Sequence, residues 1–262
     1  MGVLNVTPDS FSDGGQWFDH ALAIAHGRQL IADGADVVDV GGESTRPGAC
    51  PVAEGEELRR VMPVVEALSG EVQVSIDTRK PAVAKAAISA GARIVNDISA
   101  SLWPVAAAGG VGWIAMHSPA DPSVMASHAR YRDVVGEVVD VLVRRAEEAR
   151  AAGVSRVWID PGIGFAKTAA HNLSLLRHLD RFVATGWPVA VGTSRKSFLG
   201  ALAAGPDGTP APVVDRLEPS LATAAWAVTR GVGMIRVHDV KPTVQAVQLA
   251  LRASAEARVG AA

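Results

Sequence analysis

The chain has 262 residues, of which 48% are hydrophobic and 20% charged, and its formal net charge is −2. This composition is typical of a globular protein and excludes a disordered chain. The net charge excludes the basic surface of a protein that coats nucleic acid. Its single cysteine, Cys50, excludes an intramolecular disulfide and a cysteine-based zinc site. No apolar run approaches the roughly 18 residues of a membrane span, and the opening residues lack the basic segment of a signal peptide, so we expect a cytoplasmic protein that binds neither nucleic acid nor membranes.

Short runs rich in β-branched and other apolar residues recur along the whole chain. In chain order they cover residues 2–6, 35–40, 72–76, 92–96, 112–116, 156–159, 188–192 and 234–237. Between them the apolar residues follow helical spacing, most clearly over residues 131–149, where arginines and glutamates occupy the other face. Strands that alternate with helices predict a parallel sheet, because each parallel connection must cross back over a face of the sheet.

Glycine marks the ends of several predicted helices, just before the next strand. The glycines are Gly34, Gly91, Gly153 and Gly231. A glycine there adopts the left-handed conformation that closes a helix, without the steric penalty of a Cβ atom. Pro63 lies inside the second predicted helix, where proline can cause a kink.

Eight strand–helix units in a chain of this length match the size of a (β/α)8 barrel. An open, doubly wound sheet is the alternative, but no GxGxxG sequence follows the first strand. No linker divides the chain, and the segment AAGPDGTPAP over residues 203–212 is expected to be a loop inside the seventh unit. We therefore predict an α/β fold with a single TIM-barrel domain over residues 1–262.

Polar side chains occur where every predicted strand ends. They are Asn5, Glu43, Asp77, Asn96, Asp97, His117, Asp160, Ser194, Arg195, Lys196, Arg236, His238 and Asp239. One aspartate after a strand is more often a helix N-cap, and one histidine is more often a structural hydrogen-bonding residue. Polar residues at all eight ends predict a convergent site, because the loops at the carboxyl ends of barrel strands carry catalysis.

The residue types in this set indicate the chemistry of the ligand. Asp77, Asn96 and Asp160 can bind the donors and acceptors of a polar heterocycle. Basic side chains can hold an anion, arginine as a planar fork and lysine as a point charge. These side chains are Arg46, Arg195, Lys196, Arg236 and His238. We therefore predict a ligand with a polar ring at one end and a phosphate or carboxylate group at the other.

The chain resembles the dihydropteroate synthase family in seven motifs that occur in family order. They are MGVLNVTPDSFSDGG, GGESTRPGA, SIDTRK, IVNDIS, DPGIGFAK, GTSRKSFLG and IRVHDV, and they extend from Met1 to Val240. The resemblance implies a (β/α)8 barrel of folate biosynthesis, usually a homodimer. The family joins 6-hydroxymethyl-7,8-dihydropterin diphosphate to p-aminobenzoate, with Mg²⁺, and releases pyrophosphate and 7,8-dihydropteroate. Sulfonamides compete with p-aminobenzoate in this family.

The resemblance also implies roles for individual residues. The pterin pocket would consist of Asp77, Asn96, Met116, Asp160, Phe165, Gly192 and Lys196. Arg236 and His238 would face the diphosphate, and Asn5 would help to place the magnesium ion. The p-aminobenzoate pocket and the lid loops would include Asp9, Phe11, Thr45, Arg46, Pro47, Phe165, Lys196 and Ser197. The expected catalytic residues are Asp77, Lys196, Arg236 and His238, and no general base is expected.

Other functions are alternatives to this interpretation. The loops depart from the family pattern in NDISASLW, which lacks the glycine that commonly follows NDIS, in MHSPAD and in RLEPSLAT, so a pterin-binding paralogue with weak or no turnover is one alternative. A pterin-dependent methyltransferase would share the acidic pocket but has little need for the anion-binding residues. A zinc hydrolase is suggested by His117 and His238, but the HxH pair often found on the first strand of such enzymes is missing.

Overall fold

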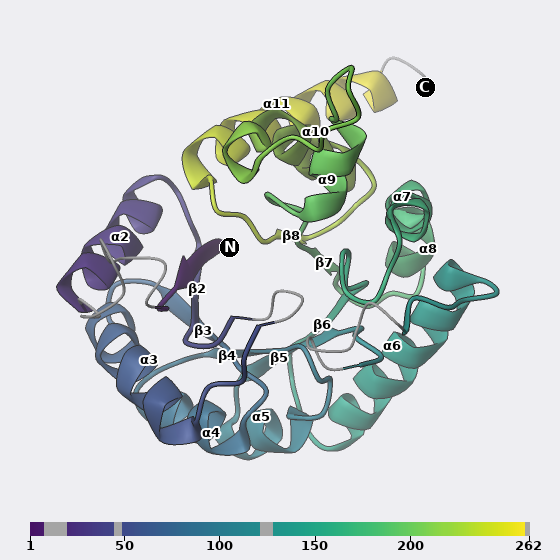
Figure 1. Cartoon of the computed structure of the whole chain (residues 1–262). Helices are drawn as coiled ribbons and strands as arrows, with labels where there is room; N and C mark the ends of the chain where they lie inside the picture. Colours follow the sequence, from purple (N-terminus) through teal and green to yellow (C-terminus); the bar gives the residue numbers. More distant parts are fainter. Residues whose placement is uncertain (8–19, 45–48, 121–127, 260–262) are drawn as a thin grey trace.

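Eight parallel strands form a closed ring in the computed structural model, which describes residues 1–7, 20–44, 49–120 and 128–259 (Figure 1). One sheet contains, in order, β1 (Gly2–Asn5), β2 (Val37–Gly41), β3 (Gln73–Asp77), β4 (Ile94–Asp97), β5 (Gly112–Met116) and β6 (Val157–Asp160). β7 (Ala190–Val191) and β8 (Met234–Ile235) form a parallel pair. Single parallel bridges join this pair to β6 and to β1, which closes the ring. The predicted (β/α)8 barrel and all eight predicted strands are confirmed.

Helices surround the ring of strands (Figure 1). They are α2 (His20–Ala32), α3 (Glu54–Leu68), α4 (Pro81–Ser89), α5 (Trp103–Gly109), α6 (Val134–Ala151), α7 (Ala169–Arg177), α8 (Leu179–Val183), α9 (Ser197–Leu202), the short 3-10 helix η2 (Val213–Asp215), α10 (Leu217–Thr229) and α11 (Val240–Val259). Pro63 lies inside α3, which is one continuous helix. The segment 203–212 is a loop between α9 and η2, as expected.

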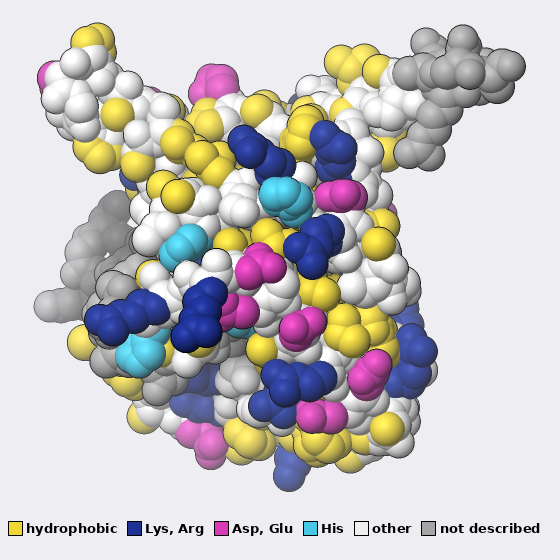
Figure 2. Space-filling view, turned by 90° about the vertical axis from the view of Figure 1, so that its right-hand side faces the viewer, with side chains coloured by type: hydrophobic (Ala, Val, Ile, Leu, Met, Phe, Trp, Pro, Cys, Tyr) yellow, Lys and Arg dark blue, Asp and Glu magenta, His cyan; other side chains and the backbone are white. Residues whose placement is uncertain are grey.

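The surface over α6, α7 and α8 carries charges of both signs. Figure 2 shows this side of the molecule, which lies at the right of Figure 1, and there the lysine and arginine side chains are interspersed with aspartate and glutamate. This mixture agrees with the formal net charge of −2. An anionic ligand would find no continuous positive field on this face. None of the described helices is both long enough and apolar enough to span a membrane.

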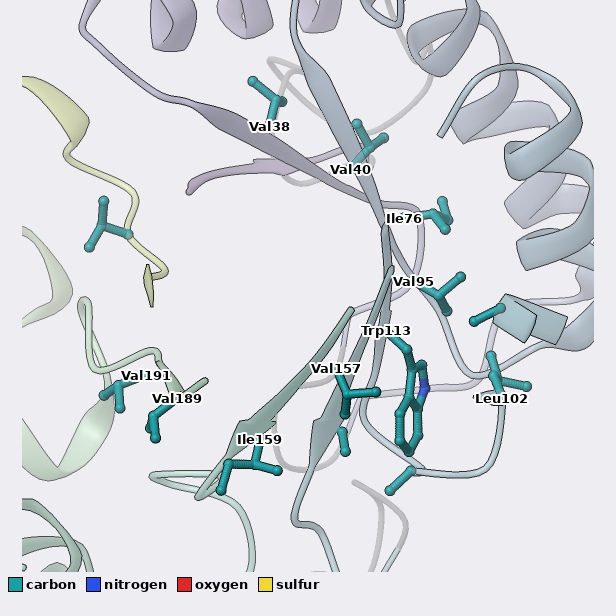
Figure 3. Close-up of a cluster of buried hydrophobic side chains, with 14 of the residues drawn as sticks. Val38, Val40, Ile76, Val95, Leu102, Trp113, Val157, Ile159, Val189 and Val191 are labelled. Carbon is teal, nitrogen blue, oxygen red and sulfur yellow. The ribbon is translucent and has the colours of Figure 1, made fainter. Parts of the chain in front are cut away.

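The strands bury a different set of side chains on each face, because successive residues of a strand point to opposite sides. Outward-facing residues such as Val38, Val40, Ile76 and Val95 pack against the helices and form the larger core (Figure 3). Inward-facing residues near the amino ends of their strands form a second cluster. It contains Val37, Ile94, Ile114, Trp158 and Ala190. The barrel is therefore filled with apolar side chains at one end, and its polar residues gather at the other.

The glycines predicted to end the helices have left-handed backbone conformations. The φ angles are +100° at Gly34, +109° at Gly91, +96° at Gly153 and +91° at Gly231. Each glycine is followed within a few residues by a strand of the barrel. These turns return the chain from the helix layer to the ring, so that each strand begins at the apolar end and finishes at the polar end.

Candidate active site

A pocket opens at the carboxyl ends of the strands. It is lined by Asp77, Asn96, Ile98, Met116, Asp160, Phe165, Gly192, Lys196 and Arg236. These residues come from the ends of β3, β4, β5 and β6 and from the segments that follow β4, β6, β7 and β8. All seven residues of the predicted pterin pocket therefore lie together, with Arg236 beside them. Ile98 was not predicted, since one apolar residue after a strand gives no signal of a site.

Asp160 and Asn96 supply hydrogen-bond acceptors to this pocket. Asp160 is 7% exposed, and its Oδ1 accepts a hydrogen bond from the backbone N–H of Gly162 at 2.8 Å. Its other oxygen makes no hydrogen bond within the described part of the chain. Asn96 Nδ2 donates to Asp39 Oδ2 at 2.9 Å. Because a carboxylate can only accept, this contact fixes the orientation of the amide and leaves Asn96 Oδ1 for a ligand.

Arg236 links two carboxylates across the barrel, one fully buried and one partly buried. Its Nε donates to Asp39 Oδ2 at 2.6 Å, and its Nη2 donates to Asp77 Oδ2 at 2.7 Å. Burial opposes the charge of the guanidinium, but the two carboxylates outweigh burial and raise the pKa of Arg236. Burial raises the pKa of Asp77 to about 7, against the opposing effect of Arg236. The pocket thus contains a permanent cation beside a carboxyl group that titrates near neutral pH.

Lys196 provides a second cation next to an aromatic ring. Its Nζ donates to the backbone oxygen of Ile163 and lies 4.7 Å from the centre of the Phe165 ring, a cation–π distance. Burial lowers the pKa of Lys196 to about 8, although the charge of Asp160 opposes this shift. Burial also raises the pKa of Asp160, and Lys196 is the first of the groups that oppose it. A carboxyl group and an amine that influence each other's charge therefore line the same pocket.

Two further basic residues predicted to hold an anion, Arg195 and His238, make contacts beside the pocket. His238 Nδ1 lies 3.0 Å from Ser194 Oγ. Arg195 forms an ion pair with Asp239, with Nε to Oδ2 at 2.9 Å. Neither His238 nor Arg195 lines the pocket. Arg195 is thus partly neutralised by its aspartate, while His238 follows Arg236 by two residues at the same rim of the barrel.

Glu43, in the GGESTRPGA motif, is engaged in an ionic network and does not line the pocket. Its carboxylate accepts hydrogen bonds from Val52 N at 3.2 Å, from Arg79 Nε at 3.1 Å and from Lys80 Nζ. Lys80 Nζ also donates to Glu57, a fully buried residue of α3. Burial alone would raise the pKa of Glu43, but Lys80 and its other partners lower it. Glu43 is therefore an ionised residue that joins the segment after β2 to Val52 and, through Lys80, to α3.

Lys167 is a partly buried lysine at the end of the motif DPGIGFAK, and the sequence assigned it no role. Its Nζ lies 3.0 Å from His117 Nδ1 and donates to the backbone oxygens of Gly162 at 3.1 Å and Phe165 at 3.0 Å. Burial lowers the pKa of Lys167 to about 7. Burial and Lys167 together lower the pKa of His117 to about 3. Lys167 thus holds the loop that carries Phe165. His117 is a further partner of the Lys167 amine.

The histidines give no support to a zinc hydrolase. His117 contacts Lys167, whereas His238 contacts Ser194. Within residues 1–7, 20–44, 49–120 and 128–259, no three His, Cys, Asp or Glu side chains are grouped so that they could hold a metal ion. A metal site built entirely from such side chains is therefore not formed by this part of the chain.

Asn5 is the residue predicted to help bind magnesium. It is the last residue of β1 and pairs with Gly41 in the parallel register. Its amide makes no hydrogen bond to another described residue. Magnesium prefers oxygen ligands, and it commonly takes one or two from the protein and the others from substrate phosphates and water. One amide oxygen at the pocket rim fits a site of that kind.

The predicted residues of the second pocket are only partly described. Ser197 begins α9 and is exposed, directly after Lys196. Asp9, Phe11, Thr45, Arg46 and Pro47 lie outside the described residues. Their part in binding p-aminobenzoate stays a prediction.

The loops around the pocket contain strained backbone. Of the residues that the structure describes, three other than glycine have positive φ: Ala100 at 48°, Ala166 at 47° and Arg195 at 59°. They follow β4, β6 and β7, at the end of the barrel where the pocket lies. Such residues are typical of functional sites, where surrounding contacts hold an unfavourable conformation. Ala100 occupies the position in NDISASLW where a glycine is common in the resembled family, so this departure carries a backbone penalty.

Known proteins similar to this chain are pterin-binding enzymes. The family model described as "Pterin binding enzyme" matches residues 1–238. The dihydropteroate synthase of Mycobacterium leprae is 46% identical over 258 residues, which cover 95% of this chain and 91% of that protein. The crystal structure of dihydropteroate synthase from Thermus thermophilus in complex with 4-aminobenzoate is 44% identical, covers 96% of this chain and 93% of its own, and superposes with a TM-score of 0.85. The Yersinia pestis dihydropteroate synthase with a sulfonamide drug is 40% identical, covers 97% and 93% of the two chains, and has a TM-score of 0.88.

Substitution of Gly162 tests the close packing of the loop after β6. Gly162 has φ of +64°, and a Cβ atom there would lie 2.0 Å from the backbone oxygen of His117. Gly110 has φ of +63° with nothing within 4 Å of its Cβ position. We expect Gly110→Ala to lower the free energy of unfolding by about 1–2 kcal/mol, the cost of the left-handed conformation alone. Gly162→Ala should cost about 1–3 kcal/mol more, because the backbone of His117, directly after β5, must also move. Urea denaturation measures both changes, and equal losses would contradict the predicted clash.

Proposed function

Because this chain belongs to the pterin-binding enzymes and is a dihydropteroate synthase, a transferase of folate biosynthesis, we propose that the pocket at the carboxyl end of its barrel performs the condensation with the residues described above. The reaction joins 6-hydroxymethyl-7,8-dihydropterin diphosphate to p-aminobenzoate and yields 7,8-dihydropteroate and pyrophosphate. The observation that carries the proposal is the meeting of Asp77, Asn96, Asp160, Lys196 and Arg236 in one pocket.

The pterin ring is proposed to lie between the acidic residues and Phe165. The open oxygen of Asp160 and Oδ1 of Asn96 would accept hydrogen bonds from the N–H groups of the aminopyrimidinone ring. Lys196 would donate to a ring acceptor, while Met116 and Phe165 bury the faces of the ring. These contacts would place the exocyclic methylene carbon of the substrate toward the rim of the pocket, where the second substrate would arrive.

The reaction needs a stabilised leaving group more than it needs a base. Negative charge develops on the diphosphate as its bond to the methylene carbon breaks, and Arg236 and His238 would stabilise that charge. The methylene carbon becomes electron-poor at the same time, and ionised Asp77 would stabilise the positive charge that spreads into the ring. A magnesium ion, held in part by Asn5, would neutralise further charge on the diphosphate.

The second substrate attacks through a neutral aromatic amine. Such an amine needs correct placement rather than deprotonation before the attack. Ser197 and Lys196 would contribute to the binding site for p-aminobenzoate. The loop segments with Asp9, Phe11, Thr45, Arg46 and Pro47 would complete it, anchored in part through Glu43. In the named structural relatives the bound 4-aminobenzoate and sulfonamide are consistent with a pocket of this kind.

Two further features belong to the proposal. The enzyme would act as a homodimer, as the family usually does. Its substrates are small soluble metabolites, which supports a reaction in the cytoplasm.

Release of pyrophosphate from purified protein tests the proposed function. We expect release from the dihydropterin diphosphate in the presence of Mg²⁺ only when p-aminobenzoate is present, with formation of 7,8-dihydropteroate. A chelator should reduce the rate, because the diphosphate then leaves with less of its charge neutralised. Pterin binding by calorimetry without any pyrophosphate release would instead identify a binding paralogue that has lost turnover.

Replacement of Asp160 tests the orientation of the pterin. Asp160→Asn keeps one oxygen for the N–H of Gly162 but presents an amide donor to the N–H groups of the ring. We expect kcat/KM to fall about 30- to 1,000-fold, the equivalent of roughly 2–4 kcal/mol of lost hydrogen bonding. The urea midpoint should stay close to that of the unsubstituted enzyme, because the local contact is retained. A loss of less than threefold would place the ring elsewhere.

The pH dependence of kcat/KM tests the role of Lys196. The folded protein holds the pKa of Lys196 at about 8, below its ordinary value of 10.5. Only the protonated amine carries the positive charge that the site uses, so kcat/KM should fall as pH rises through 8. A separate fall toward lower pH is expected from Asp77, which acts in its ionised form and has a pKa of about 7. Lys196→Arg should remove this alkaline limb, since arginine stays protonated, even if its different shape lowers the absolute rate. An unchanged limb in Lys196→Arg would assign the titration to another group.

A further inference from the structure

We propose that Asp39 is a positioning residue that connects the pterin-binding and diphosphate-binding halves of the active site. Asp39 lies in the middle of β2, where its side chain is fully buried, and it does not line the pocket. It acts through two residues that do line the pocket, Asn96 and Arg236. The inference rests on the proposed function, because it assigns Asn96 to the pterin and Arg236 to the diphosphate.

One carboxylate oxygen makes both contacts. Asp39 Oδ2 accepts from Asn96 Nδ2 at 2.9 Å and from Arg236 Nε at 2.6 Å. The contact to Asn96 determines which end of the amide faces the ligand, since a reversed amide would set two acceptors against each other. The contact to Arg236 fixes the Nε edge of the guanidinium, while Asp77 holds Nη2. Nη1 has no hydrogen-bond partner among the described residues and is therefore available to an anion.

The other oxygen of Asp39 makes no hydrogen bond to a described residue. Asp39 Oδ1 and Ser75 Oγ are the two buried side-chain atoms of the described chain that lack a hydrogen-bond partner. Asp39 and Ser75 are paired in the register of β2 and β3, so both atoms belong to one polar layer inside the barrel. A buried carboxylate with one unsatisfied oxygen is unfavourable for folding. We infer that the role of the carboxylate is to orient the side chains of Asn96 and Arg236.

Asp97 offers a matched comparison within the same barrel. It is also fully buried, on β4, but its side chain accepts hydrogen bonds from the backbone of Ser99, Ser101 and Leu102 and from Trp113 Nε1. Asp97 contacts no residue of the pocket lining through these bonds. It closes the loop after β4 and thus has a structural role, in contrast to that proposed for Asp39.

The experiment compares Asp39→Asn with Asp97→Asn. We expect Asp39→Asn to lower kcat/KM of the folded protein by roughly tenfold or more. The urea midpoint should also fall, because Arg236 loses one of its two carboxylate partners and keeps only Asp77. Asp97→Asn should lower the midpoint and leave kcat/KM of the folded protein within about threefold, since its partners lie outside the pocket. An Asp39→Asn variant that keeps full kcat/KM would overturn the inference, whatever its urea midpoint.

A double-mutant cycle separates positioning from general damage. The readout is the Kd of 6-hydroxymethyl-7,8-dihydropterin, which lacks the diphosphate, measured by calorimetry. Asp39→Asn should weaken this binding in the unsubstituted enzyme but change it less than about twofold in an Asn96→Ala background, because the residue through which Asp39 acts is then absent. An equal effect in both backgrounds would contradict the proposal.

Two controls keep the outcomes distinct. If the unsubstituted protein releases no pyrophosphate with p-aminobenzoate, the proposed function fails, while the binding cycle still tests Asp39. If Asp39→Asn does not fold, the Nε–H proton of Arg236 can be followed by NMR in the unsubstituted protein, with Arg236→Lys used for assignment. Slow exchange of that proton with solvent is expected from its bond to a buried carboxylate, and rapid exchange would overturn the inference.

Discussion

The ion pairs between Arg236 and the carboxylates of Asp39 and Asp77 are the interaction on which the rest of the site depends. The three residues come from the end of β8, from β2 and from β3, so the guanidinium crosses the mouth of the barrel and holds strands from both of its sheets. A buried charge is tolerated only when it is paired and hydrogen-bonded. This pairing keeps Arg236 charged beside the pocket, where its charge can act on a developing anion with little screening by water.

The polar mouth is possible because the opposite end of the barrel is closed by apolar side chains. Val37, Ile94, Ile114 and Trp158 fill the interior near the amino ends of the strands. The larger core between strands and helices supplies most of the buried apolar area. Burial of that area favours folding, which offsets the cost of a polar layer with unsatisfied atoms and of loops with strained backbone. Stability and function are thus assigned to opposite ends of the same strands.

The loops at the mouth are held at their bases by buried ionic or polar contacts. Lys80 joins Glu43 to Glu57 below the loop after β2. Lys167 binds backbone oxygens on both sides of the turn after β6. These lysines do not line the pocket, yet they determine where Phe165 and the start of the second loop lie. Rigid bases of this kind let a loop carry binding residues without loss of their positions.

The sequence by itself determined the order of the elements and the identity of the pocket. Hydrophobic periodicity and the glycines at helix ends placed all eight strands, because both depend on local backbone geometry. The polar residues at the strand ends then predicted Asp77, Asn96, Asp160 and Lys196 as neighbours, since parallel strands in a barrel finish at one edge. The seven motifs supplied the chemistry that joins them.

Only the tertiary structure decided which of the other polar residues serve the ligand. Asp39 and Asp97 both stand on strands, but the register and the alternation of side chains turn Asp39 into the barrel and Asp97 toward the loop after β4. Glu43, at a strand end like Asp77, binds Lys80 instead of facing the pocket. Asp39 and Arg236 are separated by 197 residues. Closure of the barrel brings them together, and no local pattern in the sequence records a contact between residues so far apart.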